Sequence, residues 1–146
     1  LGDRFVFAGF RKDVARTLSA FDLVVFPSLW EGTPLTVFET LAMGKPVVAT
    51  DADGLLDVLT DGRDALIVPK RNAPQLAAAI VRAMDDPDLR ARLGAEARST
   101  GQQYDIAAFV RKMERLYGLL HETSRATRRR GVLAADLSFL TSRASA

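Results

Sequence analysis

Two glutamates separated by seven residues, Glu31 and Glu39, mark the segment of this sequence with the most evident chemistry. Glu31 lies in a loop that leads directly into a predicted helix over residues 34–43. The first turn of a helix offers unpaired backbone N–H groups and the positive end of the helix dipole, so it favours anions. Glu39 is the only charged residue of that helix. Because burying an unpaired carboxylate is costly, we expect it to have a partner or to lie at the rim of a pocket.

These features together predict a site for a sugar diphosphate. A carboxylate can accept hydrogen bonds from two adjacent hydroxyl groups at once, which is how a sugar or a ribose presents them. We expect the phosphates at the helix start, near the amides of Leu35 and Thr36. The carboxylates of Glu31 and Glu39 would then lie on either side and accept from sugar hydroxyls.

Patterns typical of strands and helices alternate along the first half of the chain. Short apolar runs predict strands at residues 4–8, 22–26, 46–49 and 65–68. Helices are predicted at residues 11–20, 34–43, 55–60, 73–84, 87–99 and 105–121. This alternation predicts an α/β fold with a parallel sheet and helices on both faces, in which ligands bind beyond the carboxyl ends of the strands. The loops expected to be functional are 9–12, 27–34, 50–55 and 69–73.

Caps and apolar faces refine the helices. Thr33 suits the N-cap of helix 34–43, Pro34 its first position and Gly44 its end, and Asn72 suits the N-cap of the next long helix. In helix 73–84 the face expected to be apolar comprises Leu76, Ala77, Ile80, Val81 and Met84. In helix 105–121 the stripe expected to pack in a core comprises Ile106, Phe109, Val110, Met113, Leu116, Tyr117 and Leu120.

Composition excludes several kinds of protein. Hydrophobic residues make up 48% and charged residues 26%, which is typical of one globular domain. The chain has no cysteine, so disulfides and thiolate metal sites are excluded, and a zinc site or a catalytic triad would depend on its single histidine, His121. No apolar run approaches the ~20 residues that span a bilayer. We expect a cytoplasmic protein without a signal peptide, and the lack of an initiator methionine indicates a piece of a longer chain.

The segment around the two glutamates resembles the E-x7-E signature of family 4 glycosyltransferases of the GT-B fold. The order of the surrounding motifs is similar too, over about residues 3–120. The matching stretches are Phe7-Ala8-Gly9-Phe10, Ala20-Phe21-Asp22, Phe26-Pro27-Ser28, Glu31-Gly32, Ala42-Met43-Gly44-Lys45-Pro46-Val47-Val48-Ala49-Thr50, Asp61-Gly62, Ala65-Leu66-Ile67-Val68-Pro69 and Leu76-Ala77.

The resemblance implies roles for individual residues. Glu31 would act in catalysis by holding hydroxyls of the transferred sugar, with Gly32 and Thr33 beside it, and Glu39 would hold the ribose. The amides of Leu35 and Thr36 would contact the diphosphate, and the loop at Phe10 and Arg11 would lie near the base. The expected reaction is transfer of a hexose-type sugar from a UDP- or GDP-sugar with retention of configuration. It needs neither a bound metal nor a cofactor, and it depends on electrostatic stabilisation of the departing nucleoside diphosphate.

Two residues depart from the family pattern after the Pro46–Ala49 strand. Asp53 stands where the family has a glycine, and Asp57 stands where it has a glutamate. A carboxylate at position 53 would repel a neighbouring diphosphate. The run Asp51-Ala52-Asp53 also spells the D-x-D motif of metal-dependent glycosyltransferases of another fold, which we interpret as a chance match in a turn after a strand.

The resemblance also indicates what would complete the enzyme. The family's donor-binding domain begins with two further strands that carry an arginine and a lysine for the diphosphate, and a preceding domain binds the acceptor. We therefore expect residues 1–121 to be a partial donor-binding domain that binds UDP or GDP weakly and transfers no sugar by itself. Without its neighbours, the strand at 4–8 would either pair with 22–26 or remain unpaired.

The basic residues are concentrated in the last part of the chain. Residues 122–146 carry 5 Lys/Arg against 2 Asp/Glu, whereas residues 1–121 carry 15 against 16. We expect 122–146 to be a basic, partly disordered extension with at most weak contact to anionic lipid through Arg128–Arg130. A short helix over 131–137 is a further expectation.

Three other functions stay open. A non-catalytic nucleotide-binding or interaction module of the same fold would fit Asp53 and Asp57, although the Glu31/Glu39 pair argues against it. A sugar-nucleotide epimerase needs proton-transfer groups, and His121 lies far from the predicted loop. Nucleic-acid binding is disfavoured by the acidic body and by the lack of interleaved basic and aromatic residues.

Overall fold

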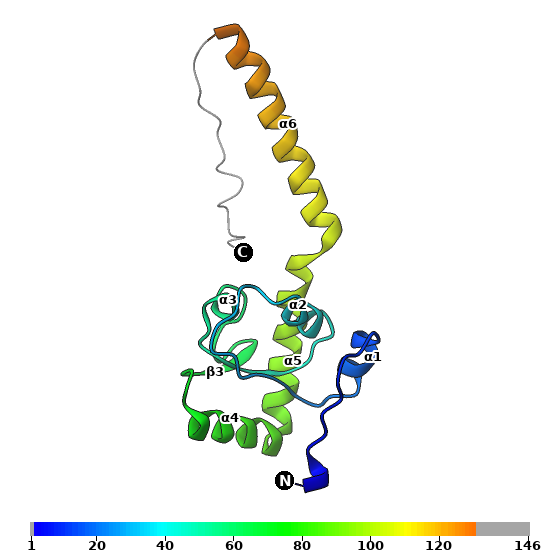
Figure 1. Ribbon diagram of the computed structural model, residues 1–146, viewed down its shortest axis with the longest axis vertical. Helices are drawn as coiled ribbons and strands as arrows, with labels where there is room; N and C mark the ends of the chain where they lie inside the picture. Colours follow the sequence, from blue (N-terminus) through cyan, green and yellow to red (C-terminus); the bar gives the residue numbers. More distant parts are fainter. Residues whose placement is uncertain (1, 131–146) are drawn as a thin grey trace. The chain divides into compact units, whose positions relative to one another are not determined.

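The computed structural model describes residues 2–130, with side chains described as far as residue 124. The chain forms two compact units that divide after Tyr104, and each is described here by itself. The first unit contains the 3-10 helix η1 (Gly2–Arg4), α1 (Val14–Ser19), β1 (Val24–Phe26), α2 (Leu35–Ala42), β2 (Val47–Thr50), α3 (Asp53–Leu56), β3 (Ala65–Val68), α4 (Ala73–Asp85), α5 (Pro87–Gly101) and the 3-10 helix η2 (Gln102–Tyr104) (Figure 1). The second unit contains α6 (Ile106–Arg130).

The centre of the first unit is a parallel sheet of three strands in the order β1-β2-β3. Val48 of β2 lies opposite Val25 of β1 on one side and Leu66 of β3 on the other. Every residue of β2 is buried, as a strand covered on both faces requires. The predicted parallel sheet is confirmed, with β3 at the predicted residues and the other two strands within two residues of the predicted bounds.

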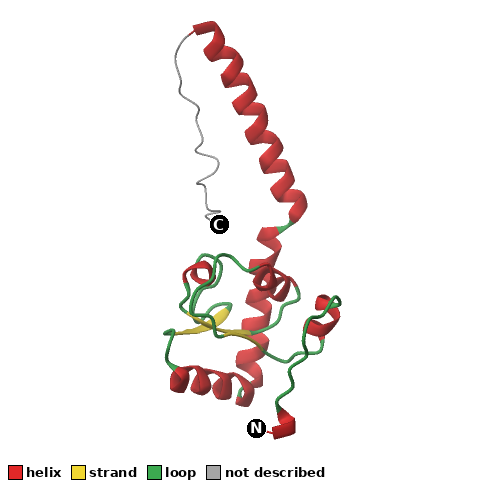
Figure 2. Cartoon of the chain, in the orientation of Figure 1, coloured by secondary structure: helices red, strands yellow, loops and turns green. Residues whose placement is uncertain are grey.

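Helices cover both faces of this sheet (Figure 2). One face packs against α2, α3 and the end of α5, and its buried residues are Val37, Leu41, Val47, Ala49, Ala52, Leu55, Val58, Leu59, Ala65 and Ala97. The other face packs against α4 and the start of α5, and its buried residues are Val48, Leu66, Ala83, Leu89 and Leu93. Alternate residues of one strand therefore point into different cores.

Helix α2 ends as the sequence predicts but begins one residue later. Gly44 has φ 64°, its N–H donates to Leu41 O, and the next N–H, of Lys45, donates to Thr40 O, which is the pattern of a Schellman cap. The N-cap residue is Pro34 rather than Thr33, and no side chain caps the helix. The prediction of a Thr33 cap is wrong.

Helix α4 confirms its predicted cap but turns a different face to the sheet. The Asn72 side chain accepts a hydrogen bond from Gln75 N, as expected. Ala83 is fully buried, whereas Val81 and Met84, which the sequence assigned to the apolar face, are exposed. The buried face passes through Leu76, Ala79, Ile80 and Ala83, because the small Ala83 allows the helix to lie close to the sheet.

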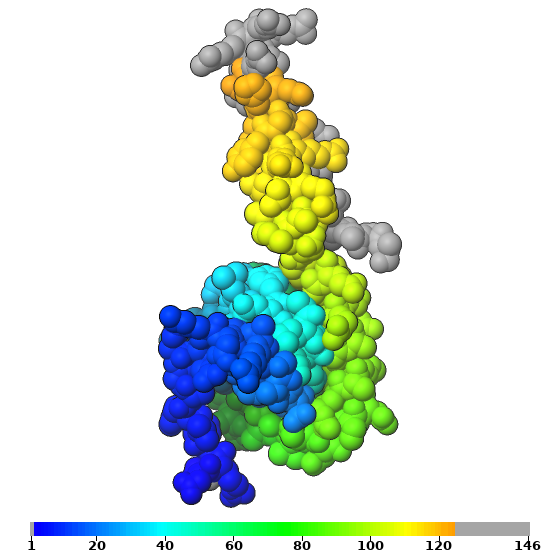
Figure 3. All heavy atoms as spheres, turned by 90° about the vertical axis from the view of Figure 1, so that its right-hand side faces the viewer, coloured from blue at the N-terminus to red at the C-terminus, as the bar shows by residue number. Residues whose placement is uncertain are grey.

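The predicted strand at residues 4–8 does not form. Residues 2–4 are a 3-10 turn, and residues 6–11 have no regular structure. No strand partner donates to or accepts from residues 5–8, and Phe7 is 90% exposed although its ring meets that of Phe5 at 4.9 Å. The strand lacks neighbours with which to form hydrogen bonds, so the unpaired alternative is the one found. Figure 3 shows this segment, in blue, standing out from the surface of the first unit.

Helix α6 differs from the prediction in length and in environment. It runs without a break through residue 121 to Arg130. Its apolar stripe does not pack in a core of the second unit: Ile106, Phe109, Val110, Tyr117 and Leu120 are all exposed. The side chains of Arg128–Arg130 and the expected helix at 131–137 lie outside the described residues.

Glycines of α5 set how closely this helix approaches α2. A Cβ atom on Gly94 would lie 2.6 Å from Gly44 O, and one on Gly101 would lie 2.7 Å from the backbone of Leu41 and Ala42. The neighbouring Arg98 donates from Nη2 to Met43 O at 3.1 Å, which ties the end of α2 to the same face of α5. The contact therefore joins backbone to backbone.

We predict that Gly94→Ala destabilises the first unit by about 1–3 kcal/mol, because the added methyl group meets a backbone oxygen that cannot move aside. Urea unfolding followed by tryptophan fluorescence from Trp30 measures the change. Gly118→Ala is the matched control: it lies in helix α6 with nothing within 4 Å of the new Cβ, so it should not destabilise. Equal stability of wild type and Gly94→Ala would contradict the close approach.

Candidate functional site

The loops that follow β1, β2 and β3 meet at the carboxyl edge of the sheet and are joined by hydrogen bonds. Thr50 Oγ1, at the end of β2, donates to Ser28 O at 2.5 Å in the loop after β1. Gly54 N, at the start of α3, donates to Glu31 O at 3.2 Å. Lys70 N, after β3, donates to Asp51 Oδ1 at 2.6 Å. The edge at which open α/β sheets bind ligands is therefore a connected set of loops.

Glu31 is half-buried and its carboxylate is held from within its own loop. Ser28 Oγ donates to Glu31 Oε1 at 2.7 Å. The other carboxylate oxygen, Oε2, accepts no hydrogen bond from a described residue, so it can accept one from a ligand.

The N-terminus of α2 follows directly and is open to solvent. The amides of its first two residues, Leu35 and Thr36, donate to no described acceptor, and Pro34 supplies no capping side chain. Gly32, Thr33, Leu35 and Thr36 are all exposed, so no side chain covers this end of the helix. An anion can reach two free N–H groups here.

Glu39 lies on the second turn of α2 and is exposed. It makes no ion pair or side-chain hydrogen bond with any described residue, so no arginine neutralises it. Of the two expected alternatives, a partner or a place at the rim of a pocket, the partner is not found among the described residues, because the helix face that carries Glu39 is not covered. Val37, Thr40 and Leu41 face the core instead. Its carboxylate is free to accept hydrogen bonds.

The three aspartates after β2 are not equivalent. Asp51 accepts from the backbone of Lys70, and Asp53, whose side chain is 92% exposed, lies 3.7 Å from Lys70 Nζ. Asp57 is exposed and is the C-cap residue of α3. Lys70 thus contacts both carboxylates of the D-x-D run, that of Asp51 through its backbone N–H and that of Asp53 through its ammonium group. Among the described residues no group of three or more His, Cys, Asp or Glu side chains is arranged to hold a metal ion.

Phe10 and Arg11 lie in the irregular segment before α1 and are exposed. The Arg11 guanidinium forms a two-pronged ion pair with Asp13, with Nε–Oδ1 at 2.9 Å and Nη2–Oδ2 at 2.8 Å. No hydrogen bond or ion pair of the described residues joins either side chain to the segment between the two glutamates. Glu31 and the α2 N-terminus adjoin in the chain, and the expected place of Phe10 and Arg11 near the base stays a prediction.

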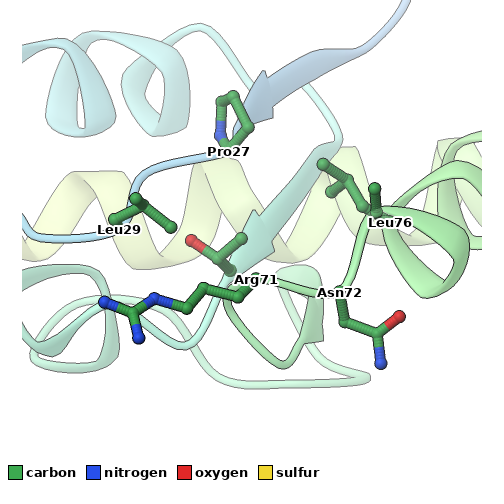
Figure 4. Close-up of a pocket in the computed structure, with 7 residues that line it drawn as sticks. Pro27, Leu29, Arg71, Asn72 and Leu76 are labelled. Carbon is green, nitrogen blue, oxygen red and sulfur yellow. The ribbon is translucent and has the colours of Figure 1, made fainter.

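A cavity of about 220 Å³ lies behind the Glu31 loop (Figure 4). Its lining comes from the ends of all three strands and from the first turn of α4, and comprises Pro27, Leu29, Thr50, Arg71, Asn72, Ala73 and Leu76. Arg71 has φ 62°, which is unusual for a residue other than glycine. The pocket is open to solvent and its lining is mostly apolar.

The sequence placed Ser28, Thr50 and Gly54 in loops expected to be functional but gave none of them a role. Ser28 and Thr50 stand where a strand meets the following loop, and Gly54 is the second residue of α3. A short side chain at the end of a buried strand can reach the neighbouring loop at the same edge.

A model of the family "Glycosyl transferases group 1" matches residues 1–86. The alpha-D-kanosaminyltransferase of Streptomyces kanamyceticus is 31% identical over 120 residues, which are 80% of this chain and 31% of that protein. The structure of a sucrose-phosphate synthase from Thermosynechococcus elongatus superposes with a TM-score of 0.78 at 34% identity, over 84% of this chain and 31% of that one. The structure of Anabaena HepE in complex with UDP-glucose superposes with a TM-score of 0.76 at 26% identity, over 81% and 33%.

This chain thus spans about a third of the length of the relatives it matches. No described helix is long and apolar enough to cross a membrane. The parallel sheet with helices on both faces is the Rossmann-like half of the GT-B glycosyltransferases among these structures. The chain belongs to the group 1 glycosyltransferases, and its sheet with the Glu31 loop is a domain of that family.

Proposed function

We propose that this chain is the donor-binding half of a retaining glycosyltransferase that takes a hexose-type sugar from UDP or GDP. The observation that carries the proposal is the pair of free amides of Leu35 and Thr36 directly after a half-buried Glu31. A structural neighbour, HepE, was solved with UDP-glucose, which is the kind of ligand these groups suit.

The diphosphate would bind at the start of α2. Its charge is attracted by the helix dipole, which contributes about 0.3–1 kcal/mol at an exposed helix end. The two amides add directed hydrogen bonds to phosphate oxygens. Because the end of α2 carries no side-chain cap, a phosphate displaces nothing from it.

The two glutamates would hold hydroxyl groups on either side of the diphosphate. Glu39 would accept from the ribose, since its carboxylate is exposed and without a partner among the described residues. Glu31 would accept from the sugar through Oε2, the oxygen that Ser28 leaves free. Gly32 and Thr33, which lie between Glu31 and the helix, would line the space between sugar and diphosphate.

Catalysis would be electrostatic. When the bond between the sugar and the phosphate breaks, negative charge grows on the departing nucleoside diphosphate, and fixed amides stabilise it without rearranging. Glu31 would hold the sugar in position for attack from the face that retains its configuration. The proposal needs no metal ion and no cofactor.

The acceptor half would come from the rest of a longer protein, as would cationic residues that complement the diphosphate. The support is the coverage of about a third of each relative together with the charge balance of the site. Lys70 lies 3.7 Å from Asp53 and Arg11 lies 2.8 Å from Asp13, so a phosphate would compete with a carboxylate for either cation. We propose a cytoplasmic location, with membrane contact limited to weak attraction between the basic end of the chain and anionic lipid.

A non-catalytic nucleotide-binding module of the same fold is the second candidate. The observation that favours it is the exposed carboxylate of Asp53 at the start of α3. The next residue, Gly54, donates its N–H to Glu31 O, so Asp53 lies close to the Glu31 loop. Glu39→Ala in the longer parent protein separates the two. Loss of sugar transfer would support a catalytic donor-binding role for this domain. Unaltered transfer would show that Glu39 takes no part in the reaction and would favour the non-catalytic module.

We predict that Glu39 and the ribose hydroxyls depend on each other. Glu39→Gln should weaken UDP binding by about tenfold, the size expected for hydrogen bonds to a charged group. It should leave the weaker binding of 2′,3′-dideoxy-UDP unchanged. NMR titration of the chain with both nucleotides measures the four constants, with Glu114→Gln on α6 as a control. Equal losses for the two nucleotides would rule out a ribose contact.

We predict that the chain alone binds UDP and GDP with a dissociation constant weaker than about 100 µM, because one helix end must offset the diphosphate charge. It should transfer no sugar from UDP-glucose or GDP-mannose. Isothermal titration calorimetry and a nucleotide-release assay measure both. A low-micromolar constant would contradict the missing-cation argument.

We predict that Asp53→Asn strengthens UDP binding by about two- to fivefold at low salt, because it removes a like charge beside the diphosphate. The gain should shrink in 0.5 M NaCl, where charges about 4 Å or more apart are screened. Asp88→Asn on α5 removes an equal charge on another element and should change nothing. A gain of the same size in both variants would point to net charge rather than to position 53.

A further inference from the structure

We propose that Ser28, Thr50 and Gly54 are positioning residues that fix the Glu31 carboxylate before the donor binds. This inference rests on the proposed function, in which Glu31 accepts hydroxyls of the transferred sugar. Three hydrogen bonds and one close backbone approach carry it.

The first contact sets the carboxylate itself. Ser28 Oγ has a single hydrogen to donate, and it donates it to Glu31 Oε1 at 2.7 Å. This restricts the rotamers of a glutamate in an irregular loop and directs Oε2 away from the serine. A glutamate without this hydrogen bond would lose its rotamer freedom only when a sugar binds. Holding the side chain in advance therefore lowers the conformational entropy lost on binding.

The second contact anchors the serine to the sheet. Thr50 is the last residue of the central strand, is 4% exposed and pairs with Val68 of β3. Its Oγ1 donates to Ser28 O at 2.5 Å. This hydrogen bond fixes the position of Ser28 relative to β2, which is buried along its whole length.

The third contact fixes the backbone of the glutamate. Gly54 N donates to Glu31 O at 3.2 Å, and a Cβ on Gly54 would lie 1.2 Å from Gly32 O. No side chain fits at position 54 while the loop stays in place. Asp53, one residue earlier, has its side chain in solvent, so the close approach belongs to Gly54 alone in this turn.

Pro27 and Leu29 line an open pocket of about 220 Å³, so this side of the loop is in part uncovered (Figure 4). The hydrogen bonds from Thr50, Ser28 and Gly54 join the loop to the sheet and to α3 on its other sides.

Two conservative pairs of variants test the proposal. Ser28→Ala and Thr50→Val each remove one donated hydrogen bond, whereas Ser28→Thr and Thr50→Ser keep the hydroxyl group. Ser19→Ala removes a hydroxyl that bonds within α1 and serves as the matched control. Circular dichroism and urea unfolding first establish that all five variants are folded.

The first readout is the order of the Glu31 side chain in the free chain, measured by NMR from the separation of its two Hγ shifts and from its three-bond couplings. We expect averaging in Ser28→Ala and in Thr50→Val, and wild-type values in Ser28→Thr, Thr50→Ser and Ser19→Ala. Unchanged order in Ser28→Ala, or loss in Ser28→Thr as large as in Ser28→Ala, would overturn the positioning role whatever the ligand.

The second readout is the ratio of the affinities for UDP-glucose and UDP, and for GDP-mannose and GDP, in wild type, Ser28→Ala and Glu31→Gln. We expect Ser28→Ala to lower the ratio for the accepted donor by about three- to tenfold and to leave the bare nucleotide unchanged. If Glu31→Gln leaves both ratios unchanged while Ser28→Ala still disorders Glu31, the proposed function fails. If Glu31→Gln lowers a ratio and Ser28→Ala does not, the positioning proposal fails and the proposed function stands.

Discussion

The pairing of β2 with a parallel strand on each side is the interaction on which the site depends. It brings the carboxyl ends of three strands to one edge, so loops that are distant in sequence come within hydrogen-bonding reach. Thr50 and Gly54 then act on the loop after β1, and Asp51 acts on the backbone after β3. The site consists of loops, but these loops are held in position by a strand that is buried on both faces.

The sequence predicts well whatever is decided within a few neighbouring residues. The strand at 65–68, the Gly44 end of α2 and the Asn72 cap of α4 all follow from local rules about apolar runs, positive φ and side-chain acceptors. What failed was decided by distant neighbours. Residues 4–8 have the composition of a strand but no partner strand, and α4 turns Ala83 rather than Met84 to the sheet because of the space between helix and sheet.

The candidate site follows the same division. The sequence located Glu31 and the start of α2, because a loop leading into a helix is a local pattern, but it predicted a Thr33 cap where the structure has none. It did not predict that Glu39 would be exposed without a partner, since a helix with mostly apolar residues need not have every face covered. It placed Ser28 and Thr50 in functional loops but gave them no role, because their contacts depend on which loop each one reaches across the edge of the sheet.

The charges around the edge are the reason for which we predict weak anion binding by this chain alone. The Lys70 ammonium lies 3.7 Å from the exposed carboxylate of Asp53, and the Lys70 backbone N–H donates to Asp51, so a phosphate near Lys70 would also meet two carboxylates. A phosphate near Arg11 would likewise meet the carboxylate of Asp13. The remaining attraction for a diphosphate comes from the dipole and the two free amides of α2. These groups would orient the phosphate oxygens but contribute little binding free energy. A site of this kind orients a ligand whose charge is balanced elsewhere. Under the proposed function, the start of α2 would orient the donor, while its affinity would depend on cations supplied by other residues.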